Sequence, residues 1–218
     1  DPGNAPNYAK RPDTVAKIRR IKSVYAGRLA LGLLDQWGTG LDILVANSLA
    51  ESFGTVPSPL STAELRRSYA AAIGIDPGAK LDAVVRYIAM RAKYLERREP
   101  GYVNPVASPG RVSVGAHHVL LSTARTLTGA TQRGTPAALI ADTADLVCRI
   151  PAESLYAAKL AIDYFNNAYA KHRNQPPLLA ATYNAGSPRP FPGNAWNLRQ
   201  YGDHVDRWVA FYNTSRMI

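Results

Sequence analysis

The sequence predicts a mostly α-helical protein, and two observations support this class. Apolar residues recur at helical spacing in one segment after another along the 218 residues, and no stretch shows the strong alternation of apolar and polar residues that is typical of strands. The chain also contains no internal repeat. Its length suits one domain with a substantial core. The single cysteine, Cys148, permits no intramolecular disulfide, and we expect it to be a buried, inert thiol.

Residues 1–12 precede the first predicted helix. Their sequence, DPGNAPNYAKRP, combines Pro, Gly and Asn without any period, so we predict a flexible arm or the remnant of a linker. Asp13 is predicted as the N-cap of the helix that follows. This helix carries an apolar stripe at Val15, Ile18, Ile21 and Tyr25, and solvated basic residues at Lys17, Arg19, Arg20 and Lys22.

Helical patterns continue along the rest of the chain. A second helix is predicted over 41–52, with Leu41, Leu44, Val45, Ser48, Leu49 and Ser52 on one face. Ser61 and Glu64 form a capping-box signature for a helix over 61–74, and 77–99 shows helical spacing that ends at Pro100. Residues 100–115 predict a loop or a short strand pair. Further helices are predicted over 116–127, 136–148, 152–171, 177–185 and 199–213.

The charge of the chain is strongly positive. Lys and Arg total 26 against 16 for Asp and Glu, a formal net charge of +10. This excess predicts a polyanionic partner, and nucleic acid, anionic lipid and bacterial cell wall all qualify. Apolar runs such as LALGLL at 29–34 are far shorter than a membrane-spanning helix, so no transmembrane segment is predicted. The chain begins with Asp1 and shows no signal peptide, and we expect that a preceding segment was removed.

Glu51 lies at the end of the apolar helical segment VANSLAESFG and is the only acid between Asp42 and Glu64. Its position seven residues after Leu44 places it at the border of the apolar stripe. Apolar neighbours desolvate a carboxyl group and favour its protonated form, which can donate a proton. The alternative is a glutamate at a helix end that simply reaches water.

Three short motifs follow one another in an order that resembles the lysozyme-like catalytic domain of lytic transglycosylases and phage endolysins. They are Glu51-Ser52 at a helix end, Gly115-Ala116 leading into Ser122-Thr123-Ala124, and Tyr183-Asn184-Ala185-Gly186. Residues 149–165 match a further helix of that family in length and apolar spacing. The resemblance covers about residues 41–212, and the ordered set is more specific than any one motif.

The resemblance implies a lysozyme-like helical domain of the goose-type lysozyme and lytic transglycosylase kind over residues 13–218. The chain between Glu51 and Gly115 is longer than in close relatives, so we interpret residues 61–99 as a helical insertion that forms one lobe. This lobe either forms one wall of the cleft or serves packing alone. The sequence departs from the family at a groove glutamine, replaced by Leu121, and at a serine position that Ser113 misses by one place.

The same resemblance assigns catalytic roles to Glu51 and Tyr183. In that family a single glutamate protonates the bridging oxygen of the β-1,4 bond between N-acetylmuramic acid and N-acetylglucosamine. It then acts as a base towards the muramic acid 6-hydroxyl, which closes a 1,6-anhydro ring. Tyr183 is expected to place its hydroxyl near the Glu51 carboxyl or the substrate N-acetyl group. The expected substrate-binding residues are Ser52, Ser113, His117 and Asn184.

Two alternatives stay open. A hydrolytic muramidase needs a second carboxylate, which Glu64, Asp76 or Glu99 can supply if the fold returns one of them to Glu51. The rival from a different class is a basic helical module that binds nucleic acid or cell-wall polymer without turnover. Under that hypothesis the basic face from Lys17 to Arg28 is the functional feature.

We expect no cofactor and no metal. The segment GRVSVG has one residue too many between its glycines for a nucleophile elbow, and no Gly-rich phosphate loop is present. His117 and His118 are adjacent and would point apart on a helix. The expected partner is the peptidoglycan glycan strand, with electrostatic attraction to anionic envelope polymers and no nucleic acid. We expect a monomeric phage endolysin or virion-associated lysin that acts on the bacterial cell wall, with a bacterial transglycosylase fragment as the near alternative.

Overall fold

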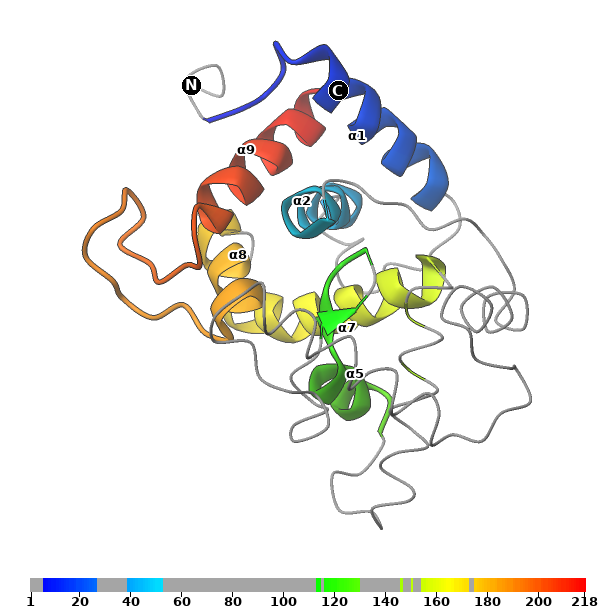
Figure 1. Cartoon of the computed structure of the whole chain (residues 1–218), viewed down its shortest axis with the longest axis vertical. Coiled ribbons are helices and arrows are strands. Elements are labelled where there is room, and N and C mark those ends of the chain that lie inside the picture. The colour runs from blue at the N-terminus through cyan, green and yellow to red at the C-terminus, as the bar shows by residue number, and fades with distance from the viewer. Residues whose placement is uncertain are drawn as a thin grey trace, which may run out of the picture. The chain divides into compact units, whose positions relative to one another are not determined.

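The computed structural model describes residues 6–26, 39–52, 113–114, 116–129, 146, 150, 154–172 and 175–218. The chain forms two compact units, one from Asp1–Val56 with Ala158–Ile218 and one from Pro57–Ala157. The described residues are mostly helical with one two-stranded sheet, which confirms the mostly α class (Figure 1). The helices predicted over 61–74 and 77–99, and therefore the 61–99 insertion, lie outside the described residues, as does Cys148.

Helix α1, Pro12–Tyr25, has Arg11 at its N-cap, so the prediction of Asp13 as the cap is wrong. Pro12 takes the first helical position because its missing N–H costs nothing there and its fixed φ suits the helix. Asp13 lies in the first turn instead, where the helix dipole favours a negative charge. The predicted stripe is buried at Ile18, Ile21 and Tyr25, and burial raises the pKa of the Tyr25 phenol to about 12.

The basic residues of α1 divide into two groups. Lys17, Arg19 and Arg20 are exposed, as predicted. Lys22 differs, because its Nζ lies 3.3 Å from Asp42 Oδ1 and donates a hydrogen bond of 2.5 Å to the Ser215 carbonyl. The prediction that Lys22 is solvated is therefore wrong. Its ammonium group neutralises a carboxylate that is only 13% exposed.

Helix α2, Gly40–Ser52, confirms the helix predicted over 41–52, but it is more deeply buried than the sequence predicted. Figure 1 shows it end-on between α1 and α9. Its residues are buried on nearly every side, and the buried set is Gly40, Ile43, Leu44, Val45, Ala46, Asn47, Ser48, Leu49 and Ala50. A helix without a solvent face encloses its polar side chains, so the single apolar face predicted from the sequence does not describe α2.

Three helices complete the first unit. They are α7, Ser154–His172, α8, Pro176–Ala185, and α9, His204–Met217. The first residues of α7 belong to the second unit. Helices α7 and α8 confirm the predicted 152–171 and 177–185 helices. The last begins five residues later than predicted, because Gly202 has a positive φ of 61° that a helix cannot continue through. Large buried core residues include Trp208, Tyr25, Tyr169, Phe165, Ile18, Ile21, Ile43, Leu44 and Leu49.

Residues at the two ends of the described first unit pack against each other. The Tyr8 ring lies 4.9 Å from the Phe211 ring, and the Tyr8 amide donates a hydrogen bond of 2.7 Å to Thr214 Oγ1. Asn213 Nδ2 donates to the Pro6 carbonyl at 2.9 Å. Residues 6–11, which the sequence predicted as part of a flexible arm, are therefore held on α9, while residues 1–5 lie outside the described part.

The second unit is described over a short hairpin and one helix. Strands β1, Ser113–Val114, and β2, Val119–Leu120, pair antiparallel, with Ser113 opposite Leu120. Helix α5, Leu121–Leu127, follows directly. Strand β1 falls at the end of the segment predicted as a loop or short strand pair over 100–115, of which 100–112 lie outside the described residues. Its partner β2 lies where a helix was predicted from 116, and the helix begins at 121 instead. A turn over 116–118, with His118 at a positive φ of 45°, returns the chain into the second strand.

None of the helices that the structure describes is long and apolar enough to cross a bilayer.

Candidate active site

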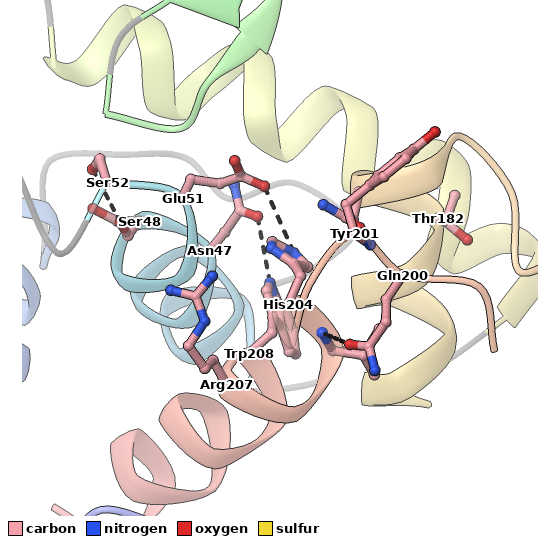
Figure 2. Close-up of polar contacts among 12 residues, drawn as sticks. Asn47, Ser48, Glu51, Ser52, Thr182, Gln200, Tyr201, His204, Arg207 and Trp208 are labelled. Atoms are coloured by element: carbon pink, nitrogen blue, oxygen red, sulfur yellow. Dashed lines mark hydrogen bonds and ion pairs between the residues drawn. The ribbon is translucent and has the colours of Figure 1, made fainter. Parts of the chain in front are cut away.

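The last turn of α2 presents Glu51 to the interior of the first unit. Its side chain is only 13% exposed. Asn47 precedes it by four residues and therefore lies on the same face of the helix, one turn earlier. Figure 2 shows both side chains projecting from α2 towards the first turns of α9. Glu51 is therefore not the solvent-exposed carboxyl group that is expected at an ordinary helix end.

His204, the first residue of α9, faces this carboxyl group. Its Nε2 atom lies 3.6 Å from Glu51 Oε1, and its side chain is only 3% exposed (Figure 2). The distance is longer than a hydrogen bond but within the range of an ion pair. Two titratable groups that are both largely shielded from water therefore lie side by side.

Tyr183 reaches the same region from α8. Its ring stacks on Phe165 at 4.9 Å and 14°, and it meets the Tyr164 ring edge-on at 5.1 Å. Burial raises the pKa of the Tyr183 phenol far above its ordinary value, and the negative charge of Glu51 raises it further. Tyr183 is therefore a neutral phenol at any physiological pH, and it can donate a hydrogen bond from its hydroxyl.

Asn47 connects these groups. Its Oδ1 accepts a hydrogen bond of 3.4 Å from Trp208 Nε1, and its side chain also hydrogen-bonds the Tyr183 hydroxyl. Asn47 is fully buried, so both of its polar ends act inside the protein. One amide thereby fixes a tyrosine of α8 and a tryptophan of α9 against α2.

The arrangement resembles an acid held ready for proton transfer. A sheltered carboxyl group has an imidazole 3.6 Å away, and it lies close enough to the Tyr183 phenol for its charge to act on that group. Low local polarity strengthens electrostatic interactions between such groups. The chemistry available to such a group is general acid and general base catalysis.

The two predicted residues next to the pair have structural partners of their own. Ser52 Oγ donates a hydrogen bond of 3.1 Å to the Ser48 carbonyl within α2. Asn184 Oδ1 accepts a hydrogen bond of 2.7 Å from the Tyr201 amide, which ties the end of α8 to the loop before α9. This loop can form because Gly186 ends α8 in the left-handed region at φ 77°. The Tyr201 side chain remains 61% exposed.

The other two predicted residues belong to the second unit and are described within it. Ser113 is the first residue of β1. His117 lies in the turn between the strands and is fully buried. Burial, reinforced by the neighbouring His118, lowers the pKa of His117 to about 3. His117 is therefore a neutral imidazole in the folded protein. The structure brings together Glu51 and Tyr183, with Ser52 and Asn184 adjoining them in sequence.

Other described acids of the first unit are engaged elsewhere. The pairs are Asp42 with Lys22, Asp163 with Lys159, Asp203 with Arg207, and Asp206 with both Trp196 and Gln200. Asp13 is exposed on α1. Within the described residues, no group of three or more His, Cys, Asp or Glu side chains is placed to hold a metal ion.

Sequence reasoning missed Asn47 and His204. Asn47 has a local signal, because it lies four residues before Glu51 in a mostly apolar helix. His204 has none, because 153 residues of chain separate two groups that only the packing of α9 on α2 brings together. A histidine at the first position of a helix is as compatible with solvent as with burial, so its role follows from tertiary structure alone.

Comparisons with known proteins leave the family open. No protein-family model, no curated protein and no solved structure matches the chain. The resemblance to the lysozyme-like domain therefore rests on the order of its sequence motifs.

Proposed function

We propose that the protein cleaves the β-1,4 bond between N-acetylmuramic acid and N-acetylglucosamine in peptidoglycan, on a lysozyme-like helical fold, with Glu51 as the proton donor. One observation carries the proposal. The acid of the Glu51-Ser52 motif is sheltered from water, and its charge acts on the tyrosine of the Tyr-Asn-Ala-Gly motif, although 132 positions separate them. Such proximity is what a shared proton-transfer site requires.

The reaction needs two proton transfers at one carboxyl group. Protonated Glu51 gives its proton to the bridging oxygen as the bond from that oxygen to the muramic acid C1 breaks. The resulting carboxylate then takes the proton of the 6-hydroxyl as its oxygen bonds to C1. The products are a 1,6-anhydro sugar and a free 4-hydroxyl, and Glu51 regains its proton. Tyr183 supports the step as a neutral donor beside the carboxylate.

The acids that the sequence offers as a second carboxylate, Glu64, Asp76 and Glu99, lie outside the described residues. Asp42, Asp163, Asp203 and Asp206 are each bound to a donor of their own within the described first unit. A hydrolytic muramidase is the alternative on the same site, in which water replaces the 6-hydroxyl and a second carboxylate takes part. Neither route requires a cofactor or a metal ion.

The charge of the protein supports a cell-wall substrate. The net charge of +10 and the exposed Lys17, Arg19 and Arg20 on α1 attract anionic envelope polymers without any specific contact. We place the enzyme on the bacterial wall, in the periplasm or outside the cell, as a monomeric phage endolysin or virion-associated lysin. A bacterial transglycosylase is the near alternative.

The decisive test compares Glu51→Gln with a control of equal charge change. Purified peptidoglycan is digested with wild type, Glu51→Gln and Asp163→Asn, and soluble muropeptides are measured by mass spectrometry. Asp163 pairs with Lys159 on α7 and is a third exposed, so its loss is inexpensive. We expect Glu51→Gln to lower the rate by about 10²- to 10⁴-fold, the usual contribution of a general acid, with folding retained.

The products of wild type decide the mechanism. A 1,6-anhydro product is lighter than the hydrolytic product by one water, so the same spectra separate the transglycosylase from the muramidase. Unchanged release by Glu51→Gln would refute the assignment of the acid.

A second candidate function is favoured by the exposed basic face of α1. Under this hypothesis the protein is a non-catalytic helical module that binds nucleic acid or wall polymer. Its affinity would fall steeply with salt, would depend on Lys17, Arg19 and Arg20, and would not respond to Glu51→Gln. Sugar-chain cleavage by wild type excludes this candidate as the whole function.

A further inference from the structure

We propose that His204 is the positioning residue that stores the proton of Glu51 and passes it to the carboxyl group when a glycan covers the site. The inference rests on the proposed function, because it explains how Glu51 is supplied with a proton near neutral pH. An ordinary carboxyl group has lost its proton two to three pH units below neutrality, whereas an imidazole titrates at about 6.5.

The geometry places the two groups for direct exchange. His204 Nε2 lies 3.6 Å from Glu51 Oε1, so a movement of about 0.8 Å gives a charge-assisted hydrogen bond of about 2.8 Å. Contacts of this kind are often long in the free enzyme and tighten when substrate binds. The His204 side chain is 3% exposed and that of Glu51 is 13% exposed, so the carboxyl group is the more accessible end of the pair.

The elements around His204 present few other charges. From α2 the acids are Glu51 and Asp42, and Asp42 is held by Lys22 of α1. From α8 the titratable group is Tyr183, a neutral phenol. On α9 itself, Asp203 pairs with Arg207, and Asp206 accepts bonds from Trp196 and Gln200. Among the described groups, the carboxylate of Glu51 is therefore the charge best placed to stabilise an imidazolium at His204.

Two forms of the pair contain one proton. In water the form with imidazolium and carboxylate is favoured about 100-fold, because an imidazole binds a proton about two pH units more tightly than a carboxyl group. Removal of water disfavours separated charge and stabilises the form with neutral imidazole and carboxylic acid. A glycan that covers Glu51 removes the remaining water. The proton then moves from His204 Nε2 to Glu51 Oε1, with no change in total charge.

The position of His204 on α9 assists this transfer. His204 is the first residue of the helix, where the dipole is positive and disfavours a cation. The imidazolium is thus stabilised mainly by the Glu51 carboxylate. Once its proton has moved to that carboxylate, His204 is left as a neutral imidazole. After bond cleavage, the carboxylate regains a proton from the 6-hydroxyl or from water, and the pair returns to its starting state.

The first experiment measures the pH profile of kcat on peptidoglycan for wild type, His204→Gln and His172→Gln. The control makes the same substitution at the last residue of α7. We expect His204→Gln to match wild type near pH 4.5 and to fall about 100-fold below it near pH 6.5, with KM little changed. His172→Gln should follow wild type throughout. A purely structural loss would lower activity equally at every pH.

The second experiment needs no activity. The imidazole of His204 is titrated by NMR in the full chain for wild type, Glu51→Gln and Asp163→Asn. We expect Glu51→Gln to lower the His204 pKa by about one unit or more and Asp163→Asn to leave it unchanged.

The outcomes separate the inference from the proposed function. Wild-type protein that releases no sugar product overturns the proposed function, while the NMR titration still reports whether the pair shares a proton. Active wild type with an unaltered pH profile in His204→Gln overturns the inference alone. So does a His204 titration that does not respond to Glu51→Gln.

Discussion

Helices α1 and α2 belong to the same unit and pack together, yet their polar side chains differ in exposure to solvent. α1 buries Ile18, Ile21 and Tyr25 and leaves Lys17, Arg19 and Arg20 in solvent. α2 is buried almost all round, including Asn47 and Ser48 at 0% exposure. A polar residue on a helix with a solvent face needs no protein partner, whereas one on an enclosed helix must find a partner or lose stability. On α2, Asn47 finds its partners in Trp208 and Tyr183, beside Glu51.

The largest expected difference between α1 and α2 is in the stability lost when a buried apolar side chain is truncated. Leu44 is fully buried in the middle of α2, and Val15 is half-buried on α1. Leu44→Ala should lower the free energy of unfolding by about 2–5 kcal/mol, because the cavity has no exposed side through which to relax. Val15→Ala should cost about 1 kcal/mol or less. Denaturant unfolding followed by circular dichroism measures both, and equal losses would contradict the enclosed position of α2.

The polar contrast is tested at Asn47. Asn47→Ala removes the acceptor of the Trp208 Nε1 hydrogen bond and the hydrogen bond between the Asn47 side chain and the Tyr183 hydroxyl. Leaving buried polar groups unpaired costs about 1–3 kcal/mol, so unfolding should become easier by that amount. Ser52→Ala on the same helix removes the hydrogen bond from its hydroxyl to the Ser48 carbonyl and serves as the control. Thermal unfolding that distinguishes the two variants supports Asn47 as the link between α2, α8 and α9.

The smallest expected effect compares two lysines on α1. Lys22 is 24% exposed and pairs with Asp42, while Lys17 is exposed. Lys22→Gln should cost about 1–2 kcal/mol because Asp42 keeps its charge in a sheltered position, discounted for the remaining solvent contact. Lys17→Gln should change stability by no more than about 0.5 kcal/mol. Chemical denaturation at low and high salt checks both, and a large loss for Lys17→Gln would show that the α1 face is not simply solvated.

Periodic patterns predicted the helices well and their ends less well. α1, α7 and α8 follow from apolar spacing because each meets the core through side chains at helical intervals, whereas α2 is a helix as predicted but is buried on nearly every side. Local backbone chemistry moved the boundaries. Pro12 displaced the N-cap from Asp13, Gly202 delayed α9, and the turn at His118 replaced the first residues of a predicted helix with a hairpin.

The candidate site was predictable only where its residues carried a local motif. Glu51 and Tyr183 stand in short sequence motifs, so they could be named before the fold was known. His204 depends on the angle at which α9 crosses α2, and the full enclosure of α2 depends on the packing of several helices at once. Such properties arise from contacts between distant segments, which no window of sequence contains.

Three contacts run along the α2 and α9 pair from end to end. Ser215 Oγ donates to Asp42 Oδ1 at the start of α2, Trp208 donates to Asn47 in the middle, and His204 faces Glu51 at the last turn. The two helices are antiparallel, so a shift of α9 by one residue along α2 would break all three contacts. The register of one helix pair thus sets the alignment of the proton donor, and a change at Ser215, three turns away, would be felt at His204.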